Sequence, residues 1–362
     1  MEEYKSTIGS SLLVPTVQEL GKDPMVSVPS KYLLPDQDPV LISDEQFCFP
    51  HQIPTIDLDS LISEDSKTAS LELEKLHLAC NDWGFFQSKL LALPLILILE
   101  ASPSSFKLVK LKVFKLRKKG IWIPVKPLPN SFIVNVGDVI EEQKLDRNDI
   151  FFLVTLPVHT RKPHLFPKLP TPFRETSNTY SWELKDLAMG ILEQMEKALK
   201  VKTKELTDLF EGGHQAMRMN YYPPCPQPEQ VIGLTPYSDA GGLTILLQVS
   251  EVEGLQIKKD GIWILVKPLP NSFIVNVGDV IEIITNGAYR SIEHRAIINP
   301  KKERLSIATF YSPSFDHEIG PAFSLVTDQS PQKYSWIGVQ EFFKGLFARV
   351  LDRKSYLDSL KL

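Results

Sequence analysis

The chain has little excess charge and few cysteines, and both shortages exclude classes of function. Its 40 lysines and arginines are balanced by 44 aspartates and glutamates, which gives a net charge of -4 at pH 7. Because this balance gives no basic footprint, nucleic acid is not an expected partner, and no charge run indicates a membrane surface. The lysine-rich stretch at residues 107–119 is interpreted as a solvated or disordered segment. The three cysteines are widely spaced and form no CxxC pair, which favours free thiols in a reducing compartment.

The sequence also lacks an apolar run that is long enough to cross a bilayer. The longest run, residues 90–99 (LLALPLILIL), is interrupted by Pro94 and is far shorter than the roughly 20 residues that a span requires. The first 20 residues lack the basic start and apolar centre of a secretory signal. We therefore expect a cytoplasmic protein.

Helical patterns are present in the N-terminal half. Residues 66–81 predict a helix between two short strands, over residues 53–58 and 83–87. A long amphipathic helix is predicted where apolar residues recur at intervals of three and four: Leu184, Leu187, Ala188, Ile191, Leu192, Met195 and Leu199. A shorter helix is expected over residues 204–210. The apolar stripe of the long helix is interpreted as core and not as a ligand site.

One segment of the chain occurs twice. Residues 120–141 recur as residues 261–282, and the copies differ only in Pro124 against Leu265. A single repeat does not make a stacked repeat architecture, which needs several copies. Either the extra copy adds a strand pair, or a recent duplication has overwritten what belonged there, and the near identity favours the second interpretation. We expect one copy to occupy the core and the stretch 88–141 to be aberrant.

After residue 211 the pattern changes to short strands. They are regularly spaced and separated by Gly, Pro and Asn-Gly breaks, which predicts an antiparallel sandwich or barrel. The segment VIEII, from Val280, is predicted as one of these strands, with Asn286 and Gly287 as a hairpin turn. Residues 339–362 return to a helical pattern.

Several polar residues fall on strand faces that alternation turns inward. His294 lies on the apolar face of YRSIEHRAII, and Arg304 and Ser306 share a face of RLSIATF. Alone, His294 could be a satisfied core histidine and Arg304 a surface ion-pair residue. A guanidinium beside a hydroxyl inside an apolar barrel is, however, suited to binding a carboxylate. Tyr237 and Asp239 share a face at the end of an earlier strand.

Four motifs together resemble plant iron(II)/2-oxoglutarate-dependent dioxygenases of the senescence-related and codeine-demethylase-like branch. They are NYYPPCPQP, TPYSDAGGLTILLQ, NVGDVIEIITNGAYRSIEHRAI and RLSIATFYSP. The resemblance covers roughly residues 10–87 and 141–362. It implies a mainly β fold with flanking helices, in which a mostly helical N-terminal region precedes a double-stranded β-helix, or jelly roll. The implied division is an N-terminal region over 1–210, a jelly-roll domain over 211–315 and a C-terminal helical tail over 316–362.

The resemblance also implies cofactors, site residues and an activity. Fe(II) and 2-oxoglutarate are expected, with O2 as co-substrate, and no catalytic residue is expected beyond the metal site. The matches to this family are Asp239 and His294 as two of three metal ligands, Arg304 and Ser306 as the pair that holds the far carboxylate of 2-oxoglutarate, and Tyr222 and Asn220 as further contacts to it. The implied reaction is hydroxylation, demethylation or desaturation of a small plant specialised metabolite.

The main departure from the family pattern is Tyr237, which stands where the family has its first metal histidine. None of the seven histidines is followed two residues later by aspartate. A phenol has a pKa near 10, ligates well only after losing its proton, and as a phenolate prefers ferric iron. Iron affinity and turnover are therefore expected to fall severely. The alternative function is a catalytically inactive relative that retains 2-oxoglutarate or metabolite binding, or a defective gene product.

Overall fold

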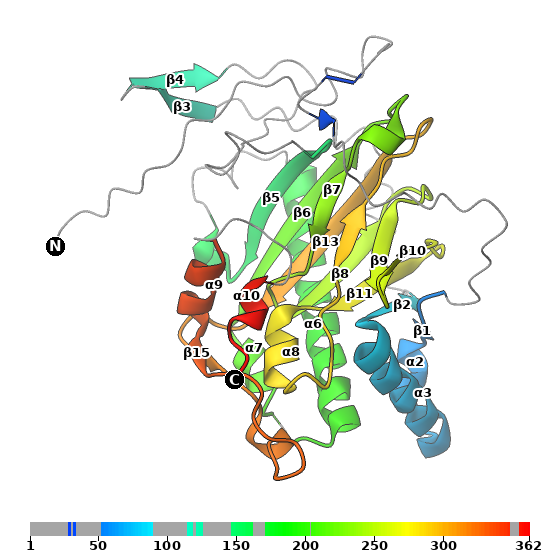
Figure 1. The fold of residues 1–362 in the computed structure, drawn as a ribbon, viewed down its shortest axis with the longest axis vertical. Helices are drawn as coiled ribbons and strands as arrows, with labels where there is room; N and C mark the ends of the chain where they lie inside the picture. Colours follow the sequence, from blue (N-terminus) through cyan, green and yellow to red (C-terminus); the bar gives the residue numbers. More distant parts are fainter. Residues whose placement is uncertain are drawn as a thin grey trace.

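The computed structural model describes residues 28–29, 32–33, 52–89, 114–118, 121–125, 146–161, 171–202, 204–347 and 355–362 (Figure 1). The apolar run at 90–99, Cys48 and most of the duplicated copy at 120–141 lie outside these residues. None of the helices within the described ranges combines the length and the apolarity that crossing a bilayer demands.

The larger of the two main sheets has seven strands. Their order is β1-β2-β11-β8-β13-β6-β5. The bounds are Thr55–Ile56 (β1), Phe85–Lys89 (β2), Ser272–Val277 (β11), Leu243–Gln248 (β8), Arg304–Ser312 (β13), His214–Tyr222 (β6) and Asp149–Leu156 (β5). The pairings are antiparallel except that of β1 with β2. The strand predicted near residues 53–58 is therefore the edge strand β1, and the strand predicted near residues 83–87 is its neighbour β2.

A smaller sheet of four strands completes the mainly β core. Its order is β10-β9-β12-β7, with bounds Ile262–Leu265 (β10), Leu255–Lys259 (β9), His294–Ala296 (β12) and Leu234–Tyr237 (β7). One apolar cluster joins the sheets, because Leu246, Ile274 and Ala308 of the larger sheet pack with Leu255 and Ile257 of the smaller. The two sheets thus form an open sandwich, as the expected jelly-roll architecture requires.

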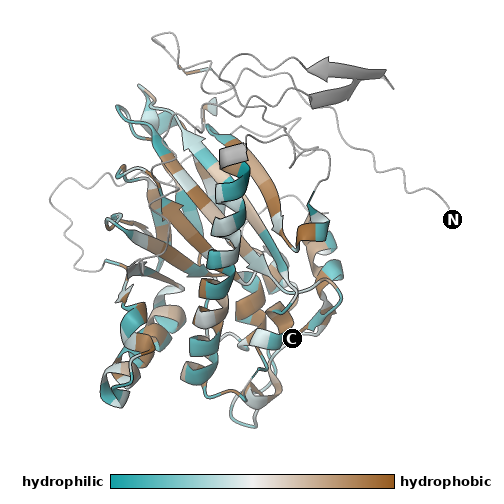
Figure 2. Ribbon diagram, turned by 180° about the vertical axis from the view of Figure 1, so that it is seen from behind, coloured by the Kyte–Doolittle hydropathy of each residue, from teal (hydrophilic) through white to brown (hydrophobic). Residues whose placement is uncertain are grey.

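Helices cover the outer face of the larger sheet. The N-terminal helices are Leu58–Leu61 (α2), Ser66–Leu78 (α3), Thr171–Leu199 (α6) and Thr207–Phe210 (α7). Figure 2 shows α6 lying across the sheet when the molecule is seen from behind. Five of the seven apolar residues predicted for its stripe are buried, and Leu187 and Leu199 are partly buried against the same core. The amphipathic pattern therefore predicted both the helix and its packing face.

The C-terminal segment adds smaller elements. They are Glu318–Ile319 (β14) paired with Ile337–Gly338 (β15), and the helices Val339–Phe347 (α9) and Ser355–Asp358 (α10). Short helical turns occur at Ala79–Trp83, Val158–Thr160, Pro228–Gln230 and Phe323–Leu325.

The strand predicted from Val280 is wrong, since Asp279–Ile284 forms a helix, α8. All six of its residues are buried, so neither a polar face nor an amphipathic period marks it in the sequence. A short apolar run of this kind does not distinguish a buried helix from a strand. Asn286 and Gly287 do adopt positive φ angles of 53° and 78°, but they follow a helix and do not join two strands.

The duplicated sequence forms strands in two places. Its second copy supplies β10 and β11 to the main sheets. In the first copy, Ile121–Val125 (β4) pairs only with Phe114–Lys118 (β3) in a separate two-stranded sheet. Lys118 is the partner of Ile121 just as Lys259 is the partner of Ile262, so the β3–β4 hairpin reproduces the register of β9–β10. Among the described strands of the two copies, only β10 and β11 of the second copy thus belong to the sandwich.

Candidate functional site

A small cavity between the two sheets collects the residues that the sequence predicted for the site. Its volume is about 30 Å³, and its lining comes from β2, β6, β7, β8, β9, β11, β12 and β13 and from Asp239 just after β7. All seven predicted residues line it: Asn220, Tyr222, Tyr237, Asp239, His294, Arg304 and Ser306. The inward orientation predicted for His294, Arg304 and Ser306 from strand alternation is therefore found in the structure.

Asp239 and His294 form the polar centre of this cavity. Oδ2 of Asp239 lies 3.8 Å from Nε2 of His294. The same oxygen accepts hydrogen bonds from Thr244 Oγ1 at 2.7 Å and from Asn276 Nδ2 at 2.8 Å. These two donors fix the orientation of the carboxylate, which is the role that outer partners play around metal ligands.

The imidazole of His294 is also held from the side opposite Asp239. Its Nδ1 lies 3.1 Å from the carbonyl oxygen of Ile292, and the ring of Phe85 packs edge-on against it with centroids 5.3 Å apart. When Nδ1 carries the proton and donates to that carbonyl, Nε2 is left with a free lone pair facing Asp239. In that tautomer the histidine presents a metal-binding nitrogen to the cavity.

Tyr237 lies directly beside His294 but directs its hydroxyl elsewhere. The two residues are cross-strand partners between β7 and β12, and their ring centroids are 4.3 Å apart. The Tyr237 hydroxyl accepts a hydrogen bond from Nη2 of Arg218 at 2.9 Å. Burial raises the pKa of Tyr237, although the nearby Arg218 guanidinium acts in the opposite direction. The side chain is therefore a protonated phenol at neutral pH.

Arg304 and Ser306 occupy another part of the cavity wall. Arg304 donates to the amide oxygen of Gln248 from Nε at 3.1 Å and from Nη2 at 2.7 Å, and its guanidinium lies 5.2 Å from the ring centroid of Tyr222. Burial lowers the pKa of Arg304, an effect that the neighbouring Tyr222 opposes. The guanidinium has a neutral partner and is well placed to exchange it for a carboxylate.

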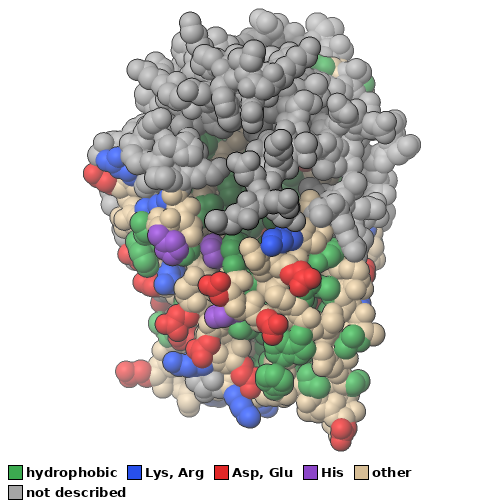
Figure 3. Space-filling view, turned by 90° about the vertical axis from the view of Figure 1, so that its left-hand side faces the viewer, with side chains coloured by type: hydrophobic (Ala, Val, Ile, Leu, Met, Phe, Trp, Pro, Cys, Tyr) green, Lys and Arg blue, Asp and Glu red, His purple; other side chains and the backbone are tan. Residues whose placement is uncertain are grey.

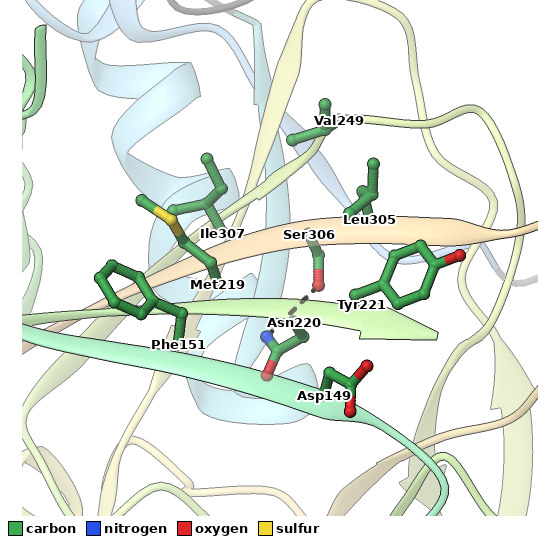
Figure 4. A pocket seen from close by; sticks show the side chains of 9 residues that line it. All are labelled: Asp149, Phe151, Met219, Asn220, Tyr221, Val249, Leu305, Ser306 and Ile307. Carbon is green, nitrogen blue, oxygen red and sulfur yellow. Dashed lines mark hydrogen bonds between the residues drawn. The ribbon is translucent and has the colours of Figure 1, made fainter. Parts of the chain in front are cut away.

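Asn220 and Ser306 meet between neighbouring strands. Figure 4 shows their side chains pointing toward each other from β6 and β13, with Asn220 Nδ2 3.4 Å from Ser306 Oγ. They also border a second cavity, of about 10 Å³, lined by Asp149, Phe151 and other residues. This second cavity holds at most about one water molecule and lacks Asp239, His294 and Arg304, so the cavity between the sheets is the candidate site.

Sequence reasoning missed four residues that shape the site: Arg218, Thr244, Gln248 and Asn276. Arg218 could have been found, because Arg218, Asn220 and Tyr222 alternate along β6 and so share one face. Thr244, Gln248 and Asn276 left no such signal, since their roles depend on which strands become neighbours.

The donors present fit a metal ion only in part. Asp239 and His294 are a carboxylate and an imidazole that face each other, but the Tyr237 phenol is bonded to Arg218 and is not a third donor. In the part of the chain that is described, no group of three or more His, Cys, Asp or Glu side chains is arranged to hold a metal ion. The described residues therefore bring together two donors of the kind that a facial triad has in threes.

The charged side chains are mixed on one face of the molecule. On the face shown in Figure 3, the described acidic and basic side chains are intermixed and form no patch of one sign. Cys80 and Cys225 are both free and buried.

Two family models match different parts of the chain. The model of the 2OG-Fe(II) oxygenase superfamily matches residues 213–313, and that of the N-terminal region of non-haem dioxygenases in morphine synthesis matches residues 53–169. The Arabidopsis thaliana protein SRG1 is 49% identical over 376 residues, with 100% of both chains covered. Codeine O-demethylase of Papaver somniferum is 44% identical over 357 residues, with 98% of both chains covered.

A solved structure is similar over the same extent. The crystal structure of JOX2 in complex with 2OG, Fe and JA has a TM-score of 0.76 and 31% sequence identity. The match covers 96% of this chain and 98% of that one. The sandwich and its flanking helices therefore have a close structural counterpart.

Proposed function

We propose that this chain, which belongs to the 2OG-Fe(II) oxygenase superfamily, oxidises a small apolar or aromatic plant metabolite by hydroxylation, demethylation or desaturation, and that Tyr237 limits its turnover. The observation that supports this most is the convergence of Asp239, His294, Arg304 and Ser306 on one cavity. The substrate class is inferred from relatives named as a codeine O-demethylase and, in Ocimum basilicum, a flavonoid 7-O-demethylase.

Fe(II) and 2-oxoglutarate are the cofactors of this family, and O2 is the co-substrate. When bound, the metal would supply the oxidising chemistry, in which O2 oxidises both 2-oxoglutarate, to succinate and CO2, and the substrate. We assign Asp239 and His294 as its protein ligands. Thr244 and Asn276 hold the Asp239 carboxylate, and the Ile292 carbonyl orients the imidazole.

We assign the far carboxylate of 2-oxoglutarate to Arg304 and Ser306. A guanidinium forms two parallel, charge-assisted hydrogen bonds to a carboxylate, and the Gln248 amide oxygen that Arg304 now contacts is a weaker acceptor. Tyr222, beneath the guanidinium, and Asn220, beside Ser306, complete this end of the site. The apolar residues Phe85, Leu246 and Leu255 keep water away from it.

Restoring the missing ligand tests the proposal. In the variant Tyr237→His we expect stoichiometric Fe(II) binding and a rate of succinate formation at least about 100-fold above that of the parent. Loss of a residue that only orients a metal ligand lowers metal affinity or activity by about 10–100-fold, and loss of a ligand itself should lower them by more. Iron is measured by elemental analysis under anaerobic conditions and succinate by chromatography. The double variant Tyr237→His, His294→Ala is the control and should lose both.

Two outcomes would contradict it. If the parent binds iron and forms succinate as fast as Tyr237→His, Tyr237 does not limit turnover. If Tyr237→His binds iron but forms no succinate, another part of the pocket is defective, and we would attribute the defect to the aberrant stretch 88–141.

A second candidate function is binding without turnover. It is favoured by the position of Tyr237, which lies against His294 and is bonded to Arg218, while Arg304 and Ser306 are retained. Calorimetric titration of 2-oxoglutarate with and without Fe(II) separates the two functions. Binding with no succinate in either condition selects the second function, whereas succinate formation that requires Fe(II) selects the first.

We also propose a monomer that acts in the cytoplasm without nucleic acid or membrane partners, in line with the net charge of -4. The division of the chain at residues 210 and 315 is likewise a proposal. The two family models lie on either side of the first boundary, at 53–169 and 213–313.

A further inference from the structure

Two buried arginines face the cavity from neighbouring strands. In the pairing of β6 with β13, Arg218 lies opposite Ala308 and Tyr222 lies opposite Arg304, so the arginines are four residues apart along the sheet. Both line the cavity. Tyr222 and Tyr237 are close enough to influence the charge of each guanidinium, so the two guanidiniums face the same stretch of the cavity.

The positive charge of these arginines is not balanced within the cavity. Arg304 has the amide oxygen of Gln248 as its acceptor, and Arg218 has the Tyr237 hydroxyl. Nε of Arg218 is buried without a hydrogen-bond partner. Within the described ranges neither arginine forms an ion pair, and Asp239 is the one carboxylate in the cavity lining. Asp239 acts on the charge of Arg218, but one carboxylate does not balance two buried guanidiniums, so the site favours an anion.

The other groups of the cavity do not remove this imbalance. Oδ2 of Asp239 is occupied by Thr244 and Asn276. Arg295, which also borders the cavity, donates to Gln256 at 2.8 Å and lies 4.2 Å from the ring centroid of Trp263. Arg218 and Arg304 are therefore the two cations that remain for a ligand.

We infer that Arg218 is a second carboxylate-binding group, and that the cavity binds a short dicarboxylate without iron, with one end on Arg304 and Ser306 and the other on Arg218. The inference rests on the assignment of Arg304 and Ser306 made under the proposed function. 2-Oxoglutarate and glutarate are members of this ligand class. Arg218 thus replaces the metal as the cation for the second end of the ligand.

Room for the ligand comes from Tyr237. The free volume of about 30 Å³ accommodates roughly one water molecule, so a dicarboxylate enters only when a side chain moves. The Tyr237 hydroxyl is the acceptor that a carboxylate would displace from Arg218. The exchange is favourable, because a charge-assisted hydrogen bond is about twice as strong as a neutral one.

Calorimetry on the full chain in excess EDTA tests this inference. We expect 2-oxoglutarate and glutarate to bind with affinities within about tenfold of each other, and 2-oxopentanoate, which lacks the second carboxylate, to bind at least about 100-fold more weakly. Arg218→Met should weaken both dicarboxylates by about 10- to 100-fold, the range for a hydrogen bond to a charged group. Unchanged affinity in Arg218→Met, or no binding by the parent in EDTA, would overturn the inference.

Tyr237→Phe is the matched control for a merely structural role of Arg218. It removes the hydroxyl that Arg218 contacts and keeps the ring. If Arg218 binds the ligand, Tyr237→Phe binds dicarboxylates at least as tightly as the parent. Equal losses of dicarboxylate affinity in Tyr237→Phe and Arg218→Met would overturn the inference. Circular dichroism melting of each variant shows that it is folded.

Arg304→Met separates this inference from the proposed function. If dicarboxylate affinity falls in Arg304→Met and is unchanged in Arg218→Met, the assignment of 2-oxoglutarate to Arg304 and Ser306 is supported and only the role of Arg218 is overturned. Iron-dependent turnover in Tyr237→His, in contrast, tests Asp239 and His294 and is independent of binding in EDTA.

Discussion

Single residues decide how this site differs from a three-ligand iron centre. Tyr237 is held between His294 and Arg218, so its hydroxyl points to a guanidinium and away from the Asp239–His294 pair. Burial lowers the tendency of Arg218 to stay charged, but Tyr237, Tyr222 and Asp239 outweigh this, and the pKa of Arg218 is raised. The pair is therefore a phenol bound to a permanent cation, which favours anion binding over metal binding.

A carboxyl outside the cavity gives the stability a pH dependence. Asp146 is half-buried and accepts a hydrogen bond from the Thr235 backbone amide at 3.0 Å. Burial raises the pKa of Asp146 to about 7. Between pH 4 and 7 the folded state thus holds this proton more tightly than the unfolded state, so Asp146 lowers stability as the pH rises through this window.

We predict that Asp146→Asn stabilises the protein at pH 8 and not at pH 4. The amide keeps the acceptor for Thr235 and removes the charge. The gain at pH 8 should be on the order of 2 kcal/mol, about half of the full effect of such a shift because Asp146 is only half-buried. Urea denaturation at both pH values measures it. Equal changes at the two pH values would show that Asp146 titrates normally.

Individual elements differ in how well the sequence specifies them. The stripe of α6 and the alternation of β12 and β13 predicted which side chains point to the core and to the cavity, because the helical and strand periods assign residues to opposite faces. Helix α8 was mistaken for a strand because it is buried on all sides. Gln248 and Asn276 entered the site through strand pairing, which the local pattern does not encode. Local periodicity therefore predicted which side chains of an element share a face, but not which strands lie next to one another in the sheet.

The buried stripe of α6 provides a test of packing. Leu192 is fully buried, whereas Leu187 on the same helix is partly buried. Leu192→Ala should lower the free energy of unfolding by about 2–5 kcal/mol, because the truncated side chain leaves a cavity. Leu187→Ala, the matched control, should cost clearly less. The urea midpoints of the two variants measure the difference, and equal losses would contradict the packing described for this helix.

At the scale of the whole molecule, the duplicated sequence shows that a strand pair needs its neighbours. The hairpins β3–β4 and β9–β10 have the same register, yet β9 also pairs with β12 and belongs to the sheet that holds His294. Within the described part of the chain, β3 and β4 pair only with each other. Two-stranded hairpins alone are marginal in water, so of the two copies we expect the second to contribute to the stability of the sandwich.

Replacing each hairpin in turn tests this division. With residues 114–125 exchanged for a Gly/Ser linker of equal length, we expect the melting temperature to stay within about 2 °C, a change of less than about 1 kcal/mol. The same exchange of residues 255–266 removes two strands of the smaller sheet, with the buried Leu255, Ile257 and Val266, and should prevent folding. Circular dichroism melting measures both variants. Because β3–β4 contributes no strand to the sandwich, a loss of folding in the first variant would mean that the extra copy has acquired a structural role of its own.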